Sequence, residues 1–194
     1  MQLVSAHNIS YTINEKKLFH NISFKVNSGE GLHIKGDNGS GKSSLLRIIL
    51  GITSPSKGSI DFLNQDLDIS FLGHKNAIKN YLTPIQTLEL LFSSSKIDIA
   101  SKWLHKLGLT NVQDELVANL SFGQQKKLAL IRVLAESPQM IVLDEPFVGL
   151  DKATSDLLNN FLVEKLSQGV GLILTSHIQP TIDCKILDLG KINA

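Results

Sequence analysis

The chain has 194 residues, of which 42% are hydrophobic and 19% are charged, and its formal net charge is +1. This size and composition suit one globular domain with a sizeable core. The near-neutral charge argues against a general nucleic-acid binder, because affinity for phosphates requires clustered lysine and arginine. The single cysteine, Cys184, excludes an internal disulfide framework and suits a reducing compartment.

The apolar segments of the chain are short. The longest, at 140–143 and 170–174, have the length of core strands and fall well below the ~20 residues of a membrane-spanning helix. Residues 1–10 carry polar residues throughout and lack the apolar region of a signal peptide. We therefore expect a protein that is soluble by itself, lies in the cytoplasm and reaches a membrane only through a partner.

Strand-like and helix-like segments alternate along the chain, which implies a parallel sheet covered by helices. Strands are expected at residues 3–6, 20–26, 31–35, 58–62, 69–72, 140–143, 170–174 and 186–189, the first two as antiparallel partners. Helices are expected at residues 44–50, from 83 onward, and at 97–107, 124–135 and 152–166. Ser95 and Asp98 have the spacing of a capping box ahead of the helix at 97–107.

The stretch 81–138 is helical and interrupts the pattern of strands. We therefore expect a single domain over residues 1–194. Its nucleotide-binding core consists of residues 1–80 and 139–194, and residues 81–138 form an inserted helical subdomain.

A glycine-rich stretch at 36–43 fits the phosphate-binding pattern G-x-x-x-x-G-K-[ST] between a predicted strand and a predicted helix. Its glycines let backbone N–H groups turn inward as an anion site, to which the helix N-terminus adds its dipole. Lys42 can reach the β- and γ-phosphate oxygens, and Ser43 can offer its hydroxyl to Mg²⁺. We assign nucleotide binding to Gly36, Asp37, Asn38, Gly39, Ser40, Gly41, Lys42, Ser43 and Ser44.

Two carboxylates, Asp144 and Glu145, follow the apolar strand at 140–143. Ligands of open α/β sheets bind beyond the carboxyl ends of the strands, so both residues are expected near the P-loop. Asp144 would hold Mg²⁺, directly or through water. Side-chain alternation predicts that Glu145 points the other way, where it could orient or deprotonate the attacking water. The competing interpretation is an exposed acidic turn, and the P-loop in the same chain favours the catalytic one.

The stretch Leu120-Ser121-Phe122-Gly123-Gln124 precedes a predicted helix. It resembles the L-S-G-G-Q signature motif of ATP-binding-cassette (ABC) ATPases, with phenylalanine at position 122 where glycine is commoner. Ser121 can donate to a phosphate oxygen, Gly123 allows close approach of the backbone, and Gln124 belongs to the same site. The resemblance implies an α/β fold, a P-loop NTPase of the ABC type. Such a fold has a mixed sheet core, an antiparallel β subdomain and an inserted helical subdomain.

Further motifs follow in the order typical of that family, so that the resemblance covers essentially the whole chain. Gly149-Leu150-Asp151 resembles the D-loop, which implies that Asp151 lies near the nucleotide. Residues 174–177 resemble the switch region, which implies that His177 contacts the γ-phosphate. Tyr11 stands where the family places an aromatic residue that stacks on adenine, although an aromatic on a strand surface is an equally good interpretation.

His74 occupies the position of the catalytic glutamine in the Q-loop of most ABC ATPases. An imidazole can still exchange one hydrogen bond with water or a Mg²⁺-bound oxygen, but its charge titrates near neutral pH, so the usual glutamine role stays open. Residues 71–83 resemble the ATPase subunits of the cytochrome c maturation system, the haem exporter, which carry Gly-His here followed by Ile-Lys and Leu-Thr. The short length and residues 144–147 fit the same subfamily.

The resemblance also implies partners and cofactors. One P-loop and one signature motif per chain imply a head-to-tail dimer, with ATP and Mg²⁺ between Lys42 of one copy and Ser121 and Gly123 of the other. Lys42, His74, Glu145 and His177 would be the catalytic residues. The partner would be an integral-membrane transporter subunit of the cytochrome c maturation complex, so that this chain lies as a peripheral protein on the cytoplasmic face of the inner membrane. Hydrolysis would release a haem-loaded chaperone.

Two other functions stay open at the level of the sequence. The chain could be the ATPase of another small ABC exporter. It could also be a soluble ABC protein that acts on nucleic acid or ribosomes as a nucleotide-gated binding module. Such proteins usually carry coiled-coil insertions or two tandem cassettes, which this chain lacks, so we expect no nucleic-acid partner.

Overall fold

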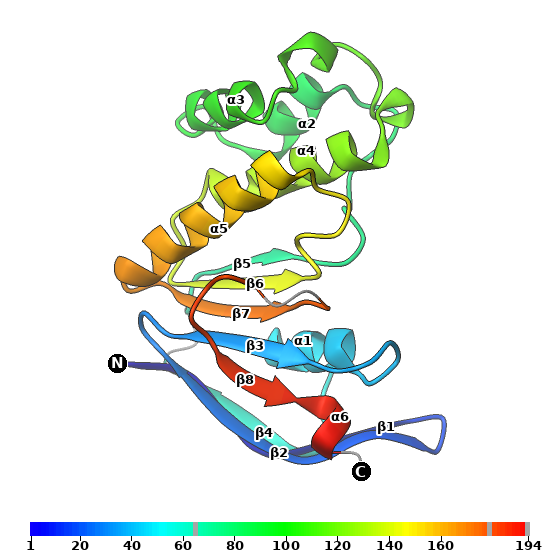
Figure 1. Ribbon diagram of the computed structural model, residues 1–194, viewed down its shortest axis with the longest axis vertical. Helices are drawn as coiled ribbons and strands as arrows, with labels where there is room; N and C mark the ends of the chain where they lie inside the picture. Colours follow the sequence, from blue (N-terminus) through cyan, green and yellow to red (C-terminus); the bar gives the residue numbers. More distant parts are fainter. Residues whose placement is uncertain (64–65, 178–179, 193–194) are drawn as a thin grey trace.

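The computed structural model describes residues 1–63, 66–177 and 180–192, and its strands form two separate sheets (Figure 1). An antiparallel sheet in the order β2-β1-β4 consists of β1 (Gln2–Ile13), β2 (Lys16–Asn27) and β4 (Lys57–Phe62). A parallel sheet in the order β5-β6-β7-β3-β8 consists of β3 (Gly31–Lys35), β5 (Ile69–Leu72), β6 (Met140–Asp144), β7 (Gly171–Thr175) and β8 (Lys185–Asp188). The predicted α/β fold class is confirmed, with parallel and antiparallel strands in different sheets.

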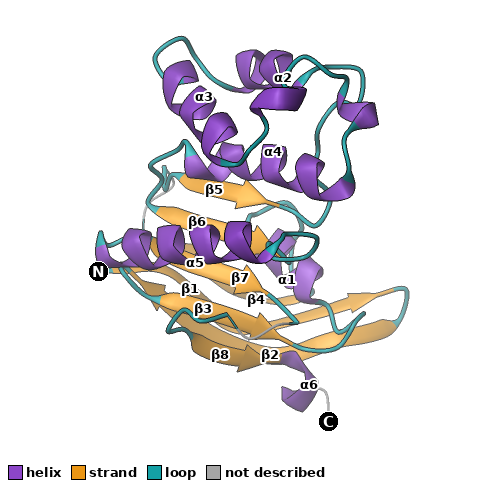
Figure 2. Cartoon of the chain, turned by 45° about the horizontal axis from the view of Figure 1, so that its top comes forward, coloured by secondary structure: helices purple, strands orange, loops and turns teal. Residues whose placement is uncertain are grey.

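The helices divide between a lobe and the flanks of the parallel sheet (Figure 2). The lobe contains α2 (Pro84–Leu91), α3 (Ile97–Lys106), α4 (Phe122–Leu134) and the 3-10 turns Thr110–Val112 and Val117–Asn119. The other helices are α1 (Lys42–Ile49), α5 (Lys152–Ser167) and α6 (Leu189–Ile192). In the described part of the chain, none of these helices combines the length and apolar character needed to cross a membrane.

Helix starts in the lobe follow local capping chemistry in two cases out of three. Thr83 and Ser121 each form a capping box, with a glutamine three residues later, at the N-termini of α2 and α4. The expected box of Ser95 and Asp98 was wrong. Lys96 is the N-cap of α3 and its side chain makes no capping hydrogen bond. The chain turns into this helix through backbone hydrogen bonds to Ser93 instead.

The parallel sheet is buried on both faces because the pleat sends alternate residues into two cores. Ile141 and Leu143 of β6 pack with α4, α5 and the lobe. Met140 and Val142 of the same strand pack on the opposite face with α1 and the antiparallel sheet. Burial on both faces explains why β6 and β7 are continuous apolar runs.

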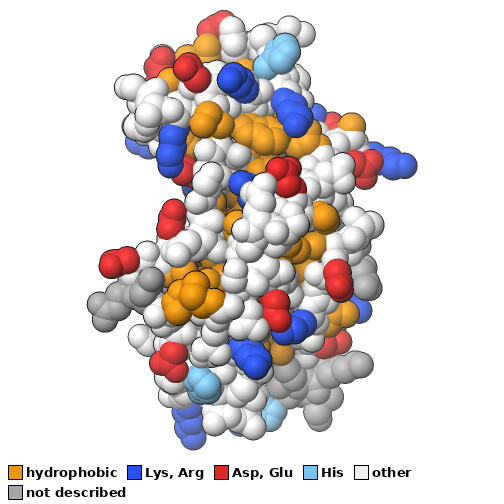
Figure 3. Space-filling view, turned by 90° about the vertical axis from the view of Figure 1, so that its left-hand side faces the viewer, with side chains coloured by type: hydrophobic (Ala, Val, Ile, Leu, Met, Phe, Trp, Pro, Cys, Tyr) orange, Lys and Arg blue, Asp and Glu red, His pale blue; other side chains and the backbone are white. Residues whose placement is uncertain are grey.

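A groove separates the lobe from the body of the protein on one side of the molecule. Figure 3 shows this side, where hydrophobic side chains gather in the hollow below the lobe. The cavity there measures about 660 Å³ and lies between α3, the end of α4, and α5. Trp103 of α3 meets Phe161 of α5 edge-on, with ring centroids 5.8 Å apart, and so packs the lobe onto the body.

The strands of the parallel sheet all point the same way, so that their carboxyl ends share one edge (Figure 1). The P-loop follows β3 at that edge, the two carboxylates end β6, and the switch region follows β7. The fold therefore brings together three motifs that are far apart in the sequence.

Candidate nucleotide-binding site

An open cavity of about 550 Å³ lies at the carboxyl edge of the parallel sheet. It brings together predicted residues from four separate segments of the chain. The lining residues are Leu18, Asn38, Gly39, Gly41, Lys42, Ser43, Ser44, His74, Asp144, Glu145, Val148 and His177. Gly36 and Asp37 line an adjoining cavity of about 410 Å³ that also contains His177.

The P-loop wraps around the N-terminus of α1 and buries the side chain of Lys42. Lys42 Nζ donates to the carbonyl oxygens of Gly36, at 2.7 Å, and Asp37, at 3.1 Å. Gly41 precedes Lys42 with φ +99°, and a Cβ there would lie 2.9 Å from Cδ1 of Phe19. Only glycine fits this turn over the Phe19 ring. The ammonium group thus rests on the loop, within reach of the space that phosphates would fill.

Glu145 is buried, and His177 lies close to both oxygens of its carboxylate. The His177 backbone N–H donates to Oε2 at 3.1 Å, and its ring Nε2 lies 3.2 Å from Oε1 without hydrogen-bond geometry. Lys42 Nζ is 3.9 Å from the same Oε1. In the described part of the chain, Oε1 therefore lies near the Lys42 ammonium and the His177 ring but accepts no hydrogen bond. A buried carboxylate oxygen in this condition has an acceptor position available for water.

Thr175 fixes the Asp144 carboxylate and the backbone of Glu145, and it was not singled out in the sequence. Its hydroxyl donates to Asp144 Oδ1 at 2.7 Å and accepts the Glu145 backbone N–H at 2.9 Å. Thr175 pairs with Asp144 in the register of β6 and β7. Only this register brings the hydroxyl to the end of β6, so that the sequence alone offers no signal for it.

Glu145 departs from the alternation that we expected. The strand ends at Asp144, and Glu145 has φ +49°, outside the extended region. The chain turns at this residue, and both carboxylates line the same cavity. The expectation that Glu145 faces the opposite side was therefore wrong, because the pleat does not continue past the end of the strand.

Lys126 is a buried cation beneath the carboxylates that sequence reasoning also missed. Its side chain is only 2% exposed on α4. Burial lowers the pKa of the Lys126 ammonium, and the charges of Asp144 and Glu145 partly oppose that shift. The apolar face of an amphipathic helix is where a lysine is least expected, so only the tertiary structure reveals this position.

Ser43 and Asp144 could hold a magnesium ion together with a nucleotide. Both line the cavity and offer oxygen atoms. Mg²⁺ takes only oxygen ligands and keeps waters and phosphate oxygens alongside one or two protein groups. Among residues 1–63, 66–177 and 180–192, no cluster of three or more His, Cys, Asp and Glu side chains could hold a metal by itself. The donor set fits a metal bound with its nucleotide.

The signature residues do not line this cavity. Ser121 and Gln124 cap α4: Ser121 Oγ accepts the Gln124 N–H at 3.2 Å, and Gln124 Oε1 accepts the Ser121 N–H at 2.8 Å. Gly123 follows within the first turn of α4, and Asp151 caps α5 through the Thr154 N–H at 2.8 Å. Within one chain these residues therefore lie outside the cavity at the P-loop.

Tyr11 also lies outside the cavity lining. Its half-buried ring faces Phe19, with centroids 6.0 Å apart. Leu18 lines the cavity beside the P-loop instead, and neither it nor Val148 was predicted as a site residue. Stacking of Tyr11 on adenine stays a prediction.

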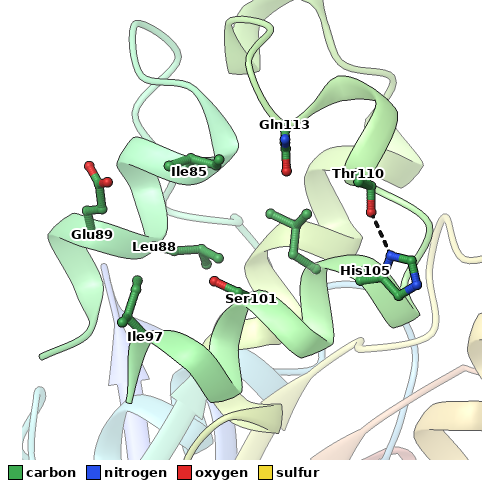
Figure 4. Close-up of a pocket in the computed structure, with 9 residues that line it drawn as sticks. Ile85, Leu88, Glu89, Ile97, Ser101, His105, Thr110 and Gln113 are labelled. Atoms are coloured by element: carbon green, nitrogen blue, oxygen red, sulfur yellow. Dashed lines mark hydrogen bonds between the residues drawn. The ribbon is translucent and has the colours of Figure 1, made fainter. Parts of the chain in front are cut away.

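A smaller cavity in the lobe has a different chemistry. Figure 4 shows it between α2 and α3, with a volume of about 220 Å³. Ile85, Leu88 and Ile97 give it an apolar wall, and His105 turns to Thr110, 3.1 Å away. It has no glycine-rich loop or buried carboxylate, so the cavity at the P-loop is the candidate site.

The fold and this cavity together define a P-loop protein with two carboxylates beside the phosphate-binding loop. Residues 19–148 match the ABC transporter family, and the chain belongs to that family. It is 37% identical to the cytochrome c biogenesis ATP-binding export protein CcmA of Idiomarina loihiensis, over 93% of this chain and 88% of the relative.

Solved structures agree on the fold. A structure described as the ATP-binding subunit of an ABC transporter superimposes with a TM-score of 0.84 at 24% identity, covering 97% of this chain and 87% of the other. The dimeric structure of a bacterial ABC transporter cassette gives a TM-score of 0.79 at 23% identity, covering 97% and 95%.

Proposed function

We propose that this chain is the ATP-hydrolysing subunit of a membrane ABC complex that serves cytochrome c maturation. The observation that carries the hydrolytic part is the buried Glu145 carboxylate, whose Oε1 lies beside Lys42 and His177 without accepting a hydrogen bond. The similarity to proteins named for cytochrome c biogenesis export supports the biological assignment.

The charged and polar residues that we assign to catalysis each have a step in the proposed hydrolysis. The phosphates of ATP lie on the P-loop, and Lys42 exchanges its bonds to the Gly36 and Asp37 carbonyls for phosphate oxygens. Glu145 Oε1 accepts a hydrogen bond from the attacking water and takes its proton. Ser43 and Asp144 would hold Mg²⁺, which neutralises charge on the β- and γ-phosphate oxygens when it is bound.

His177 and His74 both act on the γ-phosphate region in this proposal. His177 already orients Glu145 through its backbone N–H, and 44% of its side chain is exposed, so its ring is free to turn toward a phosphate oxygen. His74 is exposed and lines the same cavity. It would donate or accept one hydrogen bond with the attacking water, in place of the usual glutamine amide.

A second copy of the chain would complete the site. Ser121, Gly123 and Gln124 stand at the N-terminus of α4, outside the cavity that holds Lys42. A helix N-terminus whose serine hydroxyl can still donate a hydrogen bond suits the phosphates of a nucleotide bound to another copy. The dimeric form of a related cassette supports the same arrangement. ATP would then lie between two chains in a symmetric dimer.

We also propose an integral-membrane subunit as partner, which would place this chain at the cytoplasmic face of the inner membrane. The lobe carries an exposed apolar surface that such a subunit could cover. Tyr81 is 68% exposed and Leu116 is 46% exposed. Their segments lie side by side, since the Val117 N–H donates to the Leu82 carbonyl at 2.8 Å and the Ala118 N–H to the Asn80 carbonyl at 3.0 Å.

Glu145→Gln tests the hydrolytic assignment. We expect turnover of ATP to fall by about a hundredfold or more, because a general base is worth that much, while ATP binding persists. Glu115→Gln, at an exposed carboxylate on the lobe, is the matched control and should behave as the wild type. Normal steady-state hydrolysis by the Glu145 variant would remove Glu145 from its role.

Affinity purification of the tagged chain from solubilised membranes tests the partner. We expect a small integral-membrane protein to co-purify, and cells that lack the chain should lose mature c-type cytochromes. Recovery of ribosomes or nucleic acid, with normal cytochrome c in the deletion strain, would contradict the assignment.

A further inference from the structure

Phe122 lies with its ring against the D-loop of its own chain. It is the first residue of α4 and replaces the glycine commoner at this point of the signature motif. A Cβ placed on Gly149 would lie 2.6 Å from Cδ1 of the ring and closer still to Cε1. Gly149 has φ +82°. Gly149 is thus required for two reasons: its backbone has a positive φ, and the Phe122 ring occupies the space where a side chain would lie.

Two further contacts join the same segments. Lys127 donates to Asp151 Oδ2 at 2.6 Å, and the other carboxylate oxygen of Asp151 caps α5. A Cβ on Gly123 would lie 2.9 Å from the Gly149 carbonyl oxygen. The first two turns of α4 and the D-loop therefore contact each other through a ring, an ion pair and a close backbone approach.

The D-loop leads directly to the nucleotide cavity of the same chain. Val148 precedes Gly149 and lines that cavity. The Val148 N–H donates to the Glu145 carbonyl at 3.4 Å, and the Leu150 N–H to the Phe147 carbonyl at 3.2 Å. This tight turn runs from Glu145 to the residue under the Phe122 ring, so that a shift of the ring moves the segment that carries Glu145.

The Phe122 side chain is also well placed to sense a second copy. It is 59% exposed, although one part of the ring covers Gly149. The neighbouring Ser121 is the residue that would bind the partner's nucleotide. An aromatic ring that is half free in one chain gains contact area when another molecule closes over it.

We propose that Phe122 is a positioning residue that couples the two ATP sites of the dimer. When the signature motif closes on the partner's nucleotide, the ring presses the D-loop of its own chain and sets Glu145 for hydrolysis. The proposal rests on the proposed ATP-sandwich dimer. It adds a route, through the Phe122 ring, by which occupancy of one site changes the geometry of the other.

Phe122→Gly tests this route while it leaves Lys42, Ser121 and Gly123 in place. We expect the ATPase rate at saturating ATP to fall about tenfold, the scale of an ordinary coupling between sites, and the cooperative dependence on ATP concentration to weaken. Binding of a fluorescent ATP analogue to the single chain should stay unchanged. Phe122→Tyr, which keeps the ring, should restore both rate and cooperativity. Ile52→Ala removes an equally exposed apolar side chain and should change nothing.

The outcomes distinguish a failure of the coupling through Phe122 from a failure of the proposed function on which it rests. If the wild type neither dimerises with ATP nor hydrolyses it, the proposed function fails. If the wild type does both and Phe122→Gly keeps its rate and cooperativity, the coupling through Phe122 is overturned. A faster Phe122→Gly variant would also overturn it, because the ring would then be an obstacle. The circular dichroism spectrum of each variant checks that it folds.

Discussion

The two halves of the proposed ATP site differ in how complete they are within one chain. At the P-loop, Lys42, Asp144 and Glu145 are buried and held by internal hydrogen bonds. At the signature motif, Ser121 and Phe122 are exposed, and their contacts are those of a helix cap and a neighbouring loop. One half is preorganised for chemistry, and the other is a surface available to a second molecule.

The largest effect is expected at the preorganised half. Lys42→Ala should weaken ATP binding by about a hundredfold, because charge-assisted hydrogen bonds to phosphate are worth up to ~3 kcal/mol. Titration with a fluorescent ATP analogue measures this loss. Lys127→Ala, on the signature side, should leave binding to the single chain unchanged. If both variants lost the same affinity for the ATP analogue, the proposed difference between the P-loop half and the signature half would be contradicted.

Thr175→Val should have the next largest effect. It keeps the shape of the side chain but leaves Asp144 Oδ1 and the Glu145 N–H without this hydroxyl. We expect about 1–3 kcal/mol of destabilisation and about a tenfold loss of ATPase rate. Thr87→Val is the control, since it removes a buried hydroxyl in the lobe whose bond is to the Thr83 carbonyl. Thermal unfolding and steady-state ATPase measure both. Wild-type turnover in Thr175→Val would show that hydrolysis does not need the hydrogen bonds of the Thr175 hydroxyl to Asp144 and Glu145.

Asp151 should give a smaller effect that depends on pH. Its hydrogen bond with Lys127, above all, lowers the pKa of this carboxyl to about 2, from an ordinary value of 3.8. The pair therefore stabilises the fold above pH 3.8 and loses that contribution as pH falls toward 2. Asp151→Asn should be less stable than the wild type at neutral pH and equal to it near the lower value. Unfolding curves at both pH values measure this, and added salt should shrink the difference. A difference in stability between Asp151→Asn and the wild type that does not change with pH would contradict the stabilising role of the Asp151–Lys127 pair.

The smallest effect is expected at Tyr11. Since its ring faces Phe19 and not the cavity, Tyr11→Leu should change the affinity for ATP by less than about threefold, below 1 kcal/mol. The same titration measures it, with GTP as a comparison. A loss of tenfold or more, confined to ATP, would restore Tyr11 as the residue that stacks on adenine.

Much of this fold could be predicted because its signals are local. The P-loop, the apolar strands β6 and β7 and the helix start at Thr83 each depend on a few consecutive residues. The antiparallel hairpin was expected only in part. β1 and β2 extend twelve residues each, and their pairing contains irregularities that break the alternation of side chains.

The parts that the sequence could not reveal depend on contacts between distant segments. Thr175 reaches Asp144 through the register of two parallel strands, and Lys126 lies below Glu145 only after α4 packs on the sheet. The positive φ of Glu145 likewise follows from the turn that the folded chain makes after β6. Local patterns gave no information about any of these three.

A mixing experiment tests most directly whether one chain holds half a site. Lys42→Ala disables the P-loop half, and Ser121→Asp keeps a good helix cap while it sets a negative charge against the partner's phosphates. Each variant alone should be nearly inactive. Mixed in equal amounts, about half of the dimers contain one of each, and every such dimer has one site with both halves intact. The account predicts that ATPase activity reappears on mixing. No recovery, with mixed dimers demonstrated by differently tagged chains, would contradict it.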